Sequence, residues 1–173
     1  MRHAWRPLTA AALRCLPARL RPWLADCGSL TAALRRTLGE ALECRLQAQG
    51  WRRATADEAA RLGLGAGSAL FWRRVRFSHA GRTLLIGHTL APPSALAAWP
   101  ALRRLGDRPV GELLFADSAV RRARIELAVT PLMEPADTGP VVAARRALVP
   151  TGRQPLLVME HFLPAMLHLP VPP

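Results

Sequence analysis

Residues 69–77 read Ala-Leu-Phe-Trp-Arg-Arg-Val-Arg-Phe, and this stretch decides the fold class. Side chains of an extended chain alternate between two faces, so Phe71, Val75 and Phe77 share a face with Arg73. The pattern predicts a β-strand with one face against a core. Arg73 is then a charge among apolar neighbours, which is unfavourable unless the charge is paired or serves a ligand.

The segments around this strand predict an antiparallel sheet. A turn at 79–82, which contains Gly81, leads into a second strand over 83–91 and makes a hairpin. Further strands are predicted from alternation or apolar runs at 41–49, 120–129, 141–149 and 154–162. In the strand over 120–129, Arg122 falls on the polar side. About six strands, mostly joined by hairpins, indicate a single α+β domain.

Short helices are predicted between the strands. Ser29 or Thr31 caps the first helix, and Thr55 opens a second with a pattern that resembles a capping box. Two more are expected over 94–105 and 109–115, the latter entered by a proline.

A second charge stands among apolar residues near the C-terminus. Residues 155–164 read Pro-Leu-Leu-Val-Met-Glu-His-Phe-Leu-Pro, which is typical of a strand apolar on both faces. Glu160 shares its row with Leu156, Val158 and Phe162, and burial there is expected to raise the pKa of its carboxyl. Two interpretations stay open: Arg73 and Glu160 form a buried ion pair, or they hold a small polar ligand between them.

Composition argues against several classes of function. The chain has 173 residues, half of them hydrophobic, and a net charge of +12. All 24 basic residues are arginine, with no lysine, asparagine or tyrosine, so part of the basic excess reflects composition. With only 5% aromatic residues, the stacking platforms of a single-strand binder are missing, and we expect no nucleic-acid partner. The charge still favours small anionic substrates.

Familiar catalytic and metal-binding patterns are missing from the sequence. Its three cysteines and five histidines lack the spacing of a metal site or a disulfide framework, which favours a reducing cytoplasm and no metal. The glycine-rich residues 63–67 precede a strand and are interpreted as a loop. No apolar stretch qualifies as a membrane span.

Five blocks, in order, carry a resemblance to a known family. They cover residues 23–31, 71–75, 105–115, 124–126 and 155–164. Together they resemble chorismate pyruvate-lyases over about residues 23–164, with 1–22 as a loose lead-in and 165–173 as a tail. The resemblance implies an antiparallel α+β fold whose short helices, as helix-turn-helix flaps, cover a buried ligand pocket. His88 stands where members of the family usually have arginine.

The resemblance also implies a function and a site. Its members convert chorismate to 4-hydroxybenzoate and pyruvate, the first committed step of ubiquinone biosynthesis, without a cofactor. By position, Arg73 matches the residue that holds the ring carboxylate and Glu160 the residue near the ring hydroxyl, and both are expected to be catalytic. Leu30 and Val110 match substrate contacts from the flaps. A cytoplasmic monomer is expected.

An alternative is a small-molecule-sensing domain without catalytic activity. The effector domains of certain bacterial transcription regulators resemble chorismate lyase in fold. Such regulators carry a winged helix of some seventy residues before that domain, whereas about twenty residues precede it here. The sequence therefore favours the enzyme.

Overall fold

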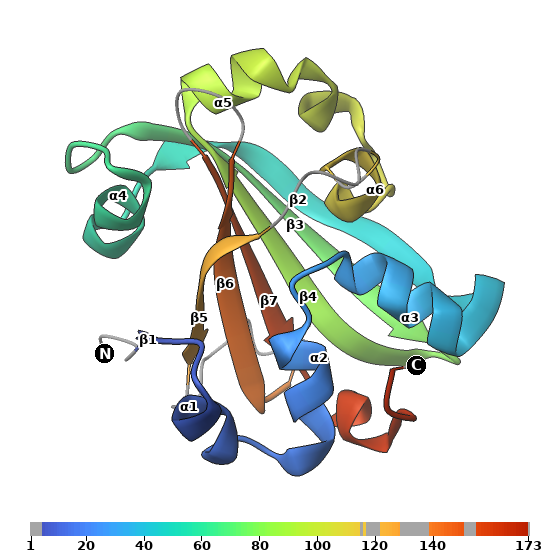
Figure 1. The fold of residues 1–173 in the computed structure, drawn as a ribbon. Coiled ribbons are helices and arrows are strands. Elements are labelled where there is room, and N and C mark those ends of the chain that lie inside the picture. The colour runs from blue at the N-terminus through green and yellow to red at the C-terminus, as the bar shows by residue number, and fades with distance from the viewer. Residues whose placement is uncertain (1–4, 115, 117–121, 129–138, 151–154, 173) are drawn as a thin grey trace.

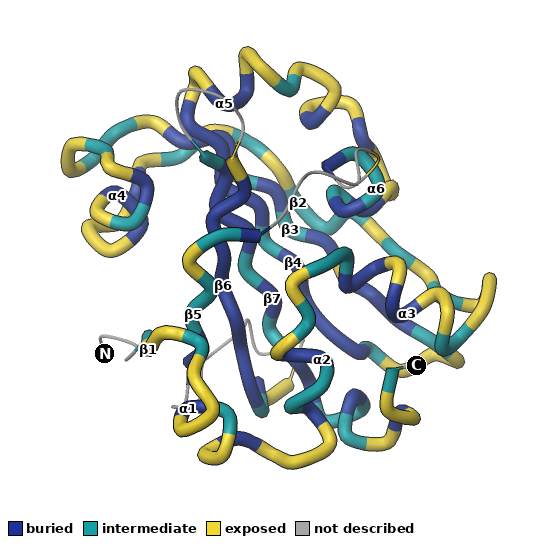
Figure 2. The backbone as a smooth tube through the Cα atoms, viewed as in Figure 1, coloured by how far each residue is buried: buried dark blue, intermediate teal, exposed yellow. Residues whose placement is uncertain are grey.

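A seven-stranded antiparallel sheet organises the computed structural model, which describes residues 5–114, 116, 122–128, 139–150 and 155–172 (Figure 1). The strands are β1 (Trp5–Pro7), β2 (Glu43–Arg53), β3 (Ala69–His79), β4 (Arg82–Ala91), β5 (Ala123–Ala128), β6 (Ala143–Val149) and β7 (Leu156–Phe162). Their order across the sheet is β1-β5-β6-β7-β4-β3-β2, and β6 is buried along its whole length (Figure 2). The predicted α+β class is confirmed.

The described strand that the sequence did not predict is β1. It pairs with β5 through only three residues, Trp5 to Pro7, too few to show a period-two pattern. The predicted ends of the strands over 120–129 and 154–162, at Val120, Val129 and Gln154, lie outside the described residues. So do most of the turn over 150–153 and the last residue of the helix over 109–115.

Short helices connect and cover the strands. They are α1 (Ala10–Arg14), α2 (Arg21–Ala25), α3 (Leu30–Leu38), α4 (Ala56–Leu62), α5 (Pro93–Ala98) and α6 (Val110–Leu114), with the 3-10 turns η1 (Ala18–Leu20), η2 (Gly39–Ala41), η3 (Pro100–Arg104) and η4 (Pro164–His168). Ser29 caps α3 by accepting a hydrogen bond from the Ala32 amide. The helix expected over 94–105 is divided into α5 and η3, because Pro100 has no amide hydrogen to continue the helix. Among the described helices, none combines the length and apolar character needed to cross a membrane.

The face of the sheet that carries Arg73 and Glu160, here the front face, holds two apolar clusters. The lower cluster joins Phe77 and Phe162 to α1, α2 and α3. The upper cluster joins Phe71 and Leu156 to α5, η3 and α6. Because the clusters sit at opposite ends of the strands, the middle of the front face lies between them.

The described parts of the expected lead-in and tail pack into the lower cluster. Leu16 and Leu20 are buried there, and so are Met166 and Leu169 from the C-terminal end. Residues 5–22 are therefore not loose in this structure, while the domain boundaries themselves stay a prediction.

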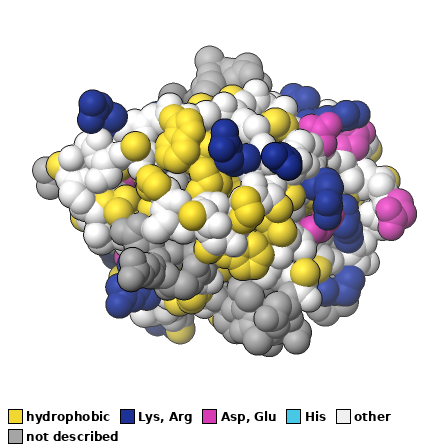
Figure 3. Space-filling model, turned by 90° about the horizontal axis from the view of Figure 1, so that it is seen from above, with side chains coloured by type: hydrophobic (Ala, Val, Ile, Leu, Met, Phe, Trp, Pro, Cys, Tyr) yellow, Lys and Arg dark blue, Asp and Glu magenta, His cyan; other side chains and the backbone are white. Residues whose placement is uncertain are grey.

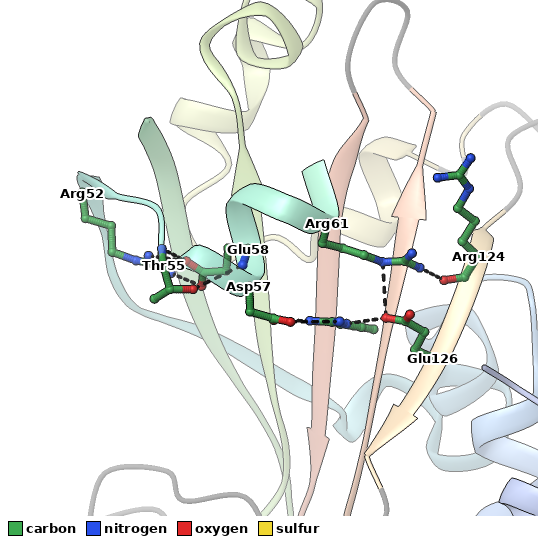
Figure 4. Close-up of polar contacts among 8 residues, drawn as sticks. Arg52, Thr55, Asp57, Glu58, Arg61, Arg124 and Glu126 are labelled. Atoms are coloured by element: carbon green, nitrogen blue, oxygen red, sulfur yellow. Dashed lines mark hydrogen bonds and ion pairs between the residues drawn. The ribbon is translucent and has the colours of Figure 1, made fainter. Parts of the chain in front are cut away.

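On the back face, a network of charges holds α4 against the sheet (Figure 4). The buried Arg146 donates to Glu126 at 2.6 Å and also to Asp57 at the start of α4. Arg61 from the last turn of α4 forms an ion pair with Glu126 at 3.3 Å. The Arg146 guanidinium also lies 4.5 Å from the ring centroid of Trp5, which ties β1 to the same network.

The start of α4 is a capping box, as its sequence predicts. The Thr55 side chain accepts from the Glu58 amide, and the Glu58 carboxylate accepts from the Thr55 amide at 2.9 Å. Arg52 adds a two-pronged contact to the same carboxylate at 2.6 and 2.7 Å. Burial opposes the charged form, but these hydrogen bonds outweigh it and lower the pKa of Glu58.

We predict that Glu58→Gln lowers the free energy of unfolding at neutral pH by about 1 to 2 kcal/mol, because the cap and the Arg52 pair both weaken. A carboxyl with a lowered folded-state pKa stabilises fully above its unfolded pKa of about 4.3 and loses this effect as pH falls through the folded value. The difference between variant and wild type should therefore shrink in acid, as denaturant titrations at several pH values would measure. Glu40→Gln, which removes an exposed acid, is the control, and an equal effect of both changes would contradict the assignment.

Candidate active site

The register of the sheet gathers polar residues into two neighbouring rows on the front face. The first row crosses β3, β4, β7 and β6 and holds Val75, Gly87, Glu160 and Arg145. The second holds Arg73, Thr89, Val158 and Ala147. The rows on either side carry large apolar residues such as Phe77 and Phe71. The two charges predicted from alternation therefore do share a face, in the band between the apolar clusters.

Glu160 is buried between two arginines. Arg122 donates from Nη2 to one carboxylate oxygen at 2.6 Å, and Arg145 donates from Nε to the other. Burial, with 5% of Glu160 exposed, opposes its charged form, but attraction to Arg122 and Arg145 and their hydrogen bonds outweigh this and lower the pKa of Glu160. The expectation of a raised pKa is wrong, because alternation within β7 could not reveal arginines from other segments.

Arg145 fastens Glu160 to the end of α2. Its Nη1 donates to the carbonyl oxygens of Trp23 at 2.8 Å, Leu24 at 3.2 Å and Asp26 at 2.5 Å. These carbonyls lie at the C-terminal end of the helix, where the helix dipole favours a cation. Arg145 is completely buried, and these contacts fix the position of its guanidinium beside the Glu160 carboxylate.

Arg73 is held differently: among the described residues, its hydrogen bonds go to backbone carbonyls. Its Nη2 donates to the carbonyl oxygens of Gly106 at 2.5 Å and Arg108 at 2.7 Å, in the segment that leads into α6. Only 1% of Arg73 is exposed, and burial lowers the pKa of its guanidinium. Its Nε and Nη1 are buried and have no hydrogen-bond partner among the described residues. Such donors suit a carboxylate from a ligand.

A cavity lies over the two rows, between the sheet and the helices α3 and α6. Its lining comprises Thr31 of α3; Val110, Gly111 and Leu114 of α6; Val75, Phe77, Gly87, His88, Thr89, Val158 and Glu160 of the sheet; and Arg122. Gly87 helps to keep the space open, since a Cβ there would stand 3.1 Å from Cγ2 of Val75. The wall is mostly apolar, with Arg122 and Glu160 as its charged members.

Of the four predicted site residues, the structure places Val110 and Glu160 in the lining of this cavity. Leu30 and Arg73 are its neighbours: Leu30 is buried in the lower cluster beside the lining residue Thr31, and Arg73 pairs across strands with Thr89.

Arg73 and Glu160 do not pair with each other, since each has other partners. Two strand spacings and a two-residue rise put their Cα atoms about 12 Å apart. The two charges therefore stand apart on the front face, in neighbouring rows.

The sequence did not identify Arg122 or Arg145 as site residues. Arg122 was expected on the polar side of a strand, but it is buried before β5, where a bulge shifts the register between Ala123 and Glu126. Arg145 could have been found by pairing the predicted strands of the β6–β7 hairpin, because their register places Arg145 opposite Glu160.

His88 and His161 do not form a metal site with other described side chains. Their rings lie on the back face with centroids 4.9 Å apart, which agrees with His161 as the opposite-face neighbour of Glu160. Within the described ranges, no three histidine, cysteine, aspartate or glutamate side chains gather so that they could hold a metal ion.

A second hollow lies at η3 and α6, lined by Pro100, Ala101, Arg103, Arg104, Leu105, Arg108 and Leu113. Figure 3 views the molecule from above and shows apolar and arginine side chains intermingled on that face. Its lining has no carboxylate, so the acid and base groups of the site belong to the inner cavity.

Comparison with known proteins matches this arrangement to one family. A family model described as chorismate lyase matches residues 2–169. The chain belongs to the chorismate lyase family. Two relatives carry the name "Probable chorismate pyruvate-lyase". The one from Azoarcus sp. (strain BH72) is 37% identical and the alignment covers 90% of this chain and 89% of the relative. The one from Methylococcus capsulatus is 35% identical, and the alignment covers 87% of this chain and 98% of the relative.

Solved structures of other proteins resemble this chorismate lyase family member in fold. PhnF from Mycobacterium smegmatis superposes with a TM-score of 0.62 at 14% identity, covering 82% of this chain and 66% of PhnF. A GntR-family transcriptional regulator from Bacillus cereus gives 0.54 at 10% identity, covering 73% and 94%. Identities this low show a shared fold alone.

We predict that Arg145→Met lowers the free energy of unfolding by about 3 to 5 kcal/mol, because it leaves three carbonyls and one side of a buried carboxylate without their donor. Denaturant unfolding followed by circular dichroism measures this. Arg19→Met, at an exposed arginine, should stay within about 0.5 kcal/mol of wild type. A loss below about 1 kcal/mol in Arg145→Met would contradict the anchoring role.

Proposed function

We propose that this protein converts chorismate to 4-hydroxybenzoate and pyruvate. The observation that supports this most directly is a buried cavity in a chorismate lyase family member, with the ionised Glu160 in its wall and Arg73 in the neighbouring row of the sheet. This matches a ring with a hydroxyl at one end and a carboxylate at the other.

The reaction needs positioning more than strong acid or base chemistry. The C3–O ether bond and the C4–H bond break, and a C3–C4 double bond completes the aromatic ring. The departing enolpyruvate gains a proton on its methylene carbon and becomes pyruvate, so one proton is lost and one gained. Because aromatisation drives the reaction, confinement in a reactive geometry is the main task of the protein.

Arg73 is proposed to hold the ring carboxylate. Its side chain offers a planar fork of donors that matches a carboxylate, and two of its nitrogens have no partner among the described residues. At an effective dielectric near 20, the attraction between two such charges at about 4 Å is about 4 kcal/mol before desolvation. Leu30 of α3 and Val110 of α6 would contact the ring from the helices that cover the cavity.

Glu160 is proposed to accept a hydrogen bond from the C4 hydroxyl. Its lowered pKa makes it a carboxylate at neutral pH, and a carboxylate only accepts hydrogen bonds. Two arginines also make it a weak base. We therefore assign Glu160 to orientation of the ring and not to proton transfer.

In the cell, the product 4-hydroxybenzoate would enter ubiquinone biosynthesis at its first committed step. Action in the cytoplasm, as a monomer, without a cofactor and without a nucleic-acid partner, stays a prediction.

Purified protein mixed with chorismate tests the activity, with 4-hydroxybenzoate and pyruvate followed by chromatography. Equimolar formation of both supports the proposal. Binding of chorismate without turnover would favour a sensing domain of the same fold.

We predict that Arg73→Gln weakens the binding of both chorismate and 4-hydroxybenzoate by about 10- to 100-fold, because both ligands carry the ring carboxylate. Michaelis constants and product inhibition measure the two effects. Arg76→Gln on the same strand removes an exposed arginine from the opposite face and should change neither. An unchanged KM in Arg73→Gln would remove the anchor assignment.

We predict that kcat of the wild type shows no inflection due to Glu160 between about pH 5 and 9, since a carboxyl with a lowered pKa is ionised throughout this range. Glu160→Gln should keep the shape of the pH profile and lose affinity for the ring hydroxyl. A wild-type inflection near neutrality that disappears in Glu160→Gln would instead show that this carboxyl transfers a proton.

A further inference from the structure

Arg122 is a buried cation in the wall of the cavity that the proposed roles leave unassigned. Its side chain is only 3% exposed and reaches the cavity from the residue before β5. Nη2 donates to Glu160 at 2.6 Å, and Nε donates to the carbonyl oxygen of Gly28 at 3.0 Å. These two contacts fix the plane of the guanidinium beside the carboxylate.

Arginines outnumber acids among the buried charged side chains that the structure describes on the front face. Within the described residues of this face, the buried charged side chains are Arg73, Arg122, Arg145 and Glu160, three positive and one negative. Asp26 is a further acid that acts on Arg122; it is half-buried and accepts from the Gly28 amide at 2.7 Å. Chorismate carries two carboxylates, and buried arginines are groups that bind carboxylates with two hydrogen bonds.

The positions of the arginines suggest how the two carboxylates are divided. Arg145 contacts Glu160, two carbonyls of α2 and the carbonyl of Asp26, and it lies outside the cavity lining. Arg73 lies at the end assigned to the ring carboxylate. Arg122 lines the cavity at the opposite end, in contact with Glu160.

The structure of the substrate places its second carboxylate at this end. The hydroxyl on C4 and the enolpyruvyl ether on C3 are on adjacent ring carbons. A ring whose C4 hydroxyl bonds Glu160 therefore carries its enolpyruvyl group next to whatever adjoins Glu160. We propose that Arg122 binds the enolpyruvyl carboxylate of chorismate and thereby distinguishes the substrate from 4-hydroxybenzoate, an inference that rests on the proposed function.

This contact would hold the enolpyruvyl group over the bond that breaks. The arginine fork fixes a carboxylate in a plane, so the ether oxygen and the methylene carbon stay close to C3 and C4. The product 4-hydroxybenzoate lacks this carboxylate, so Arg122 contributes to binding of the substrate and not of the aromatic product.

A competing role for Arg122 is positioning of Glu160 alone. In that case the loss of Arg122 disturbs the contact to the C4 oxygen, which substrate and product share. The two roles therefore differ in whether the affinities for the two kinds of ligand fall together.

The test uses two stable aromatic ligands, so it does not depend on turnover. One is 4-hydroxybenzoate, and the other is 3-(carboxymethoxy)-4-hydroxybenzoate, which adds a carboxylate on the ether at C3. Calorimetry on wild type and Arg122→Gln should show about 10- to 100-fold weaker binding of the dicarboxylate and a change below about threefold for 4-hydroxybenzoate. Arg103→Gln, an exposed arginine of the outer hollow, removes the same charge and should change neither.

Equal losses for the two ligands, or no loss for either, would overturn the inference. If Arg122→Gln does not fold, Arg122→Lys keeps the charge without the planar fork. A loss of several-fold for the dicarboxylate alone then supports the inference, and an equal loss for both overturns it.

The proposed function fails separately. If the wild type made no 4-hydroxybenzoate from chorismate but Arg122→Gln lost the dicarboxylate selectively, the second carboxylate site would stand without the activity. If the wild type bound neither ligand, both proposals would fail.

Discussion

The buried contact between Arg145 and Glu160 is the interaction on which the front face depends. It joins β6 to β7, and through three carbonyl oxygens it joins both strands to the end of α2. Arg122, in the segment before β5, also donates to this carboxylate and to the carbonyl oxygen of Gly28, so it links both segments to the cluster. A buried charge is tolerated only when its partners are fixed, so this cluster sets where α2 and the start of α3 can lie.

The cavity follows from that constraint. The rows above and below the charges are filled by apolar side chains, which close into two separate clusters around α2 and α3 on one side and α5 and α6 on the other. Between them, Gly87 contributes no side chain, and hydrogen bonds from Arg122 and Arg145 fix the position of the Glu160 carboxylate. The clusters therefore cannot merge, and a cavity with charged groups in its wall remains.

Period-two alternation predicted what depends on one strand. It placed Arg73 and Glu160 on the same face, because that requires only their neighbours in β3 and β7. It missed Arg145, whose importance depends on the register between strands, and Arg122, which precedes a bulge where Arg124 has a φ of 49° and alternation fails. The pKa of Glu160 was predicted in the wrong direction for the same reason, since burial was visible in the sequence and its two partners were not.

A shared fold with transcription regulators leaves open what separates catalysis from sensing, and the distribution of charge offers a physical answer. On the proposed assignment, Arg73 and Arg122 hold the two carboxylates of one molecule at opposite ends of the cavity. Once the ether bond breaks, these carboxylates belong to different molecules, and neither product alone satisfies both arginines. A sensor needs only to retain its ligand. A cation in the cavity wall (Arg122) and a second beside the cavity (Arg73) would favour the intact dianion over each monoanionic product, which helps the products to leave.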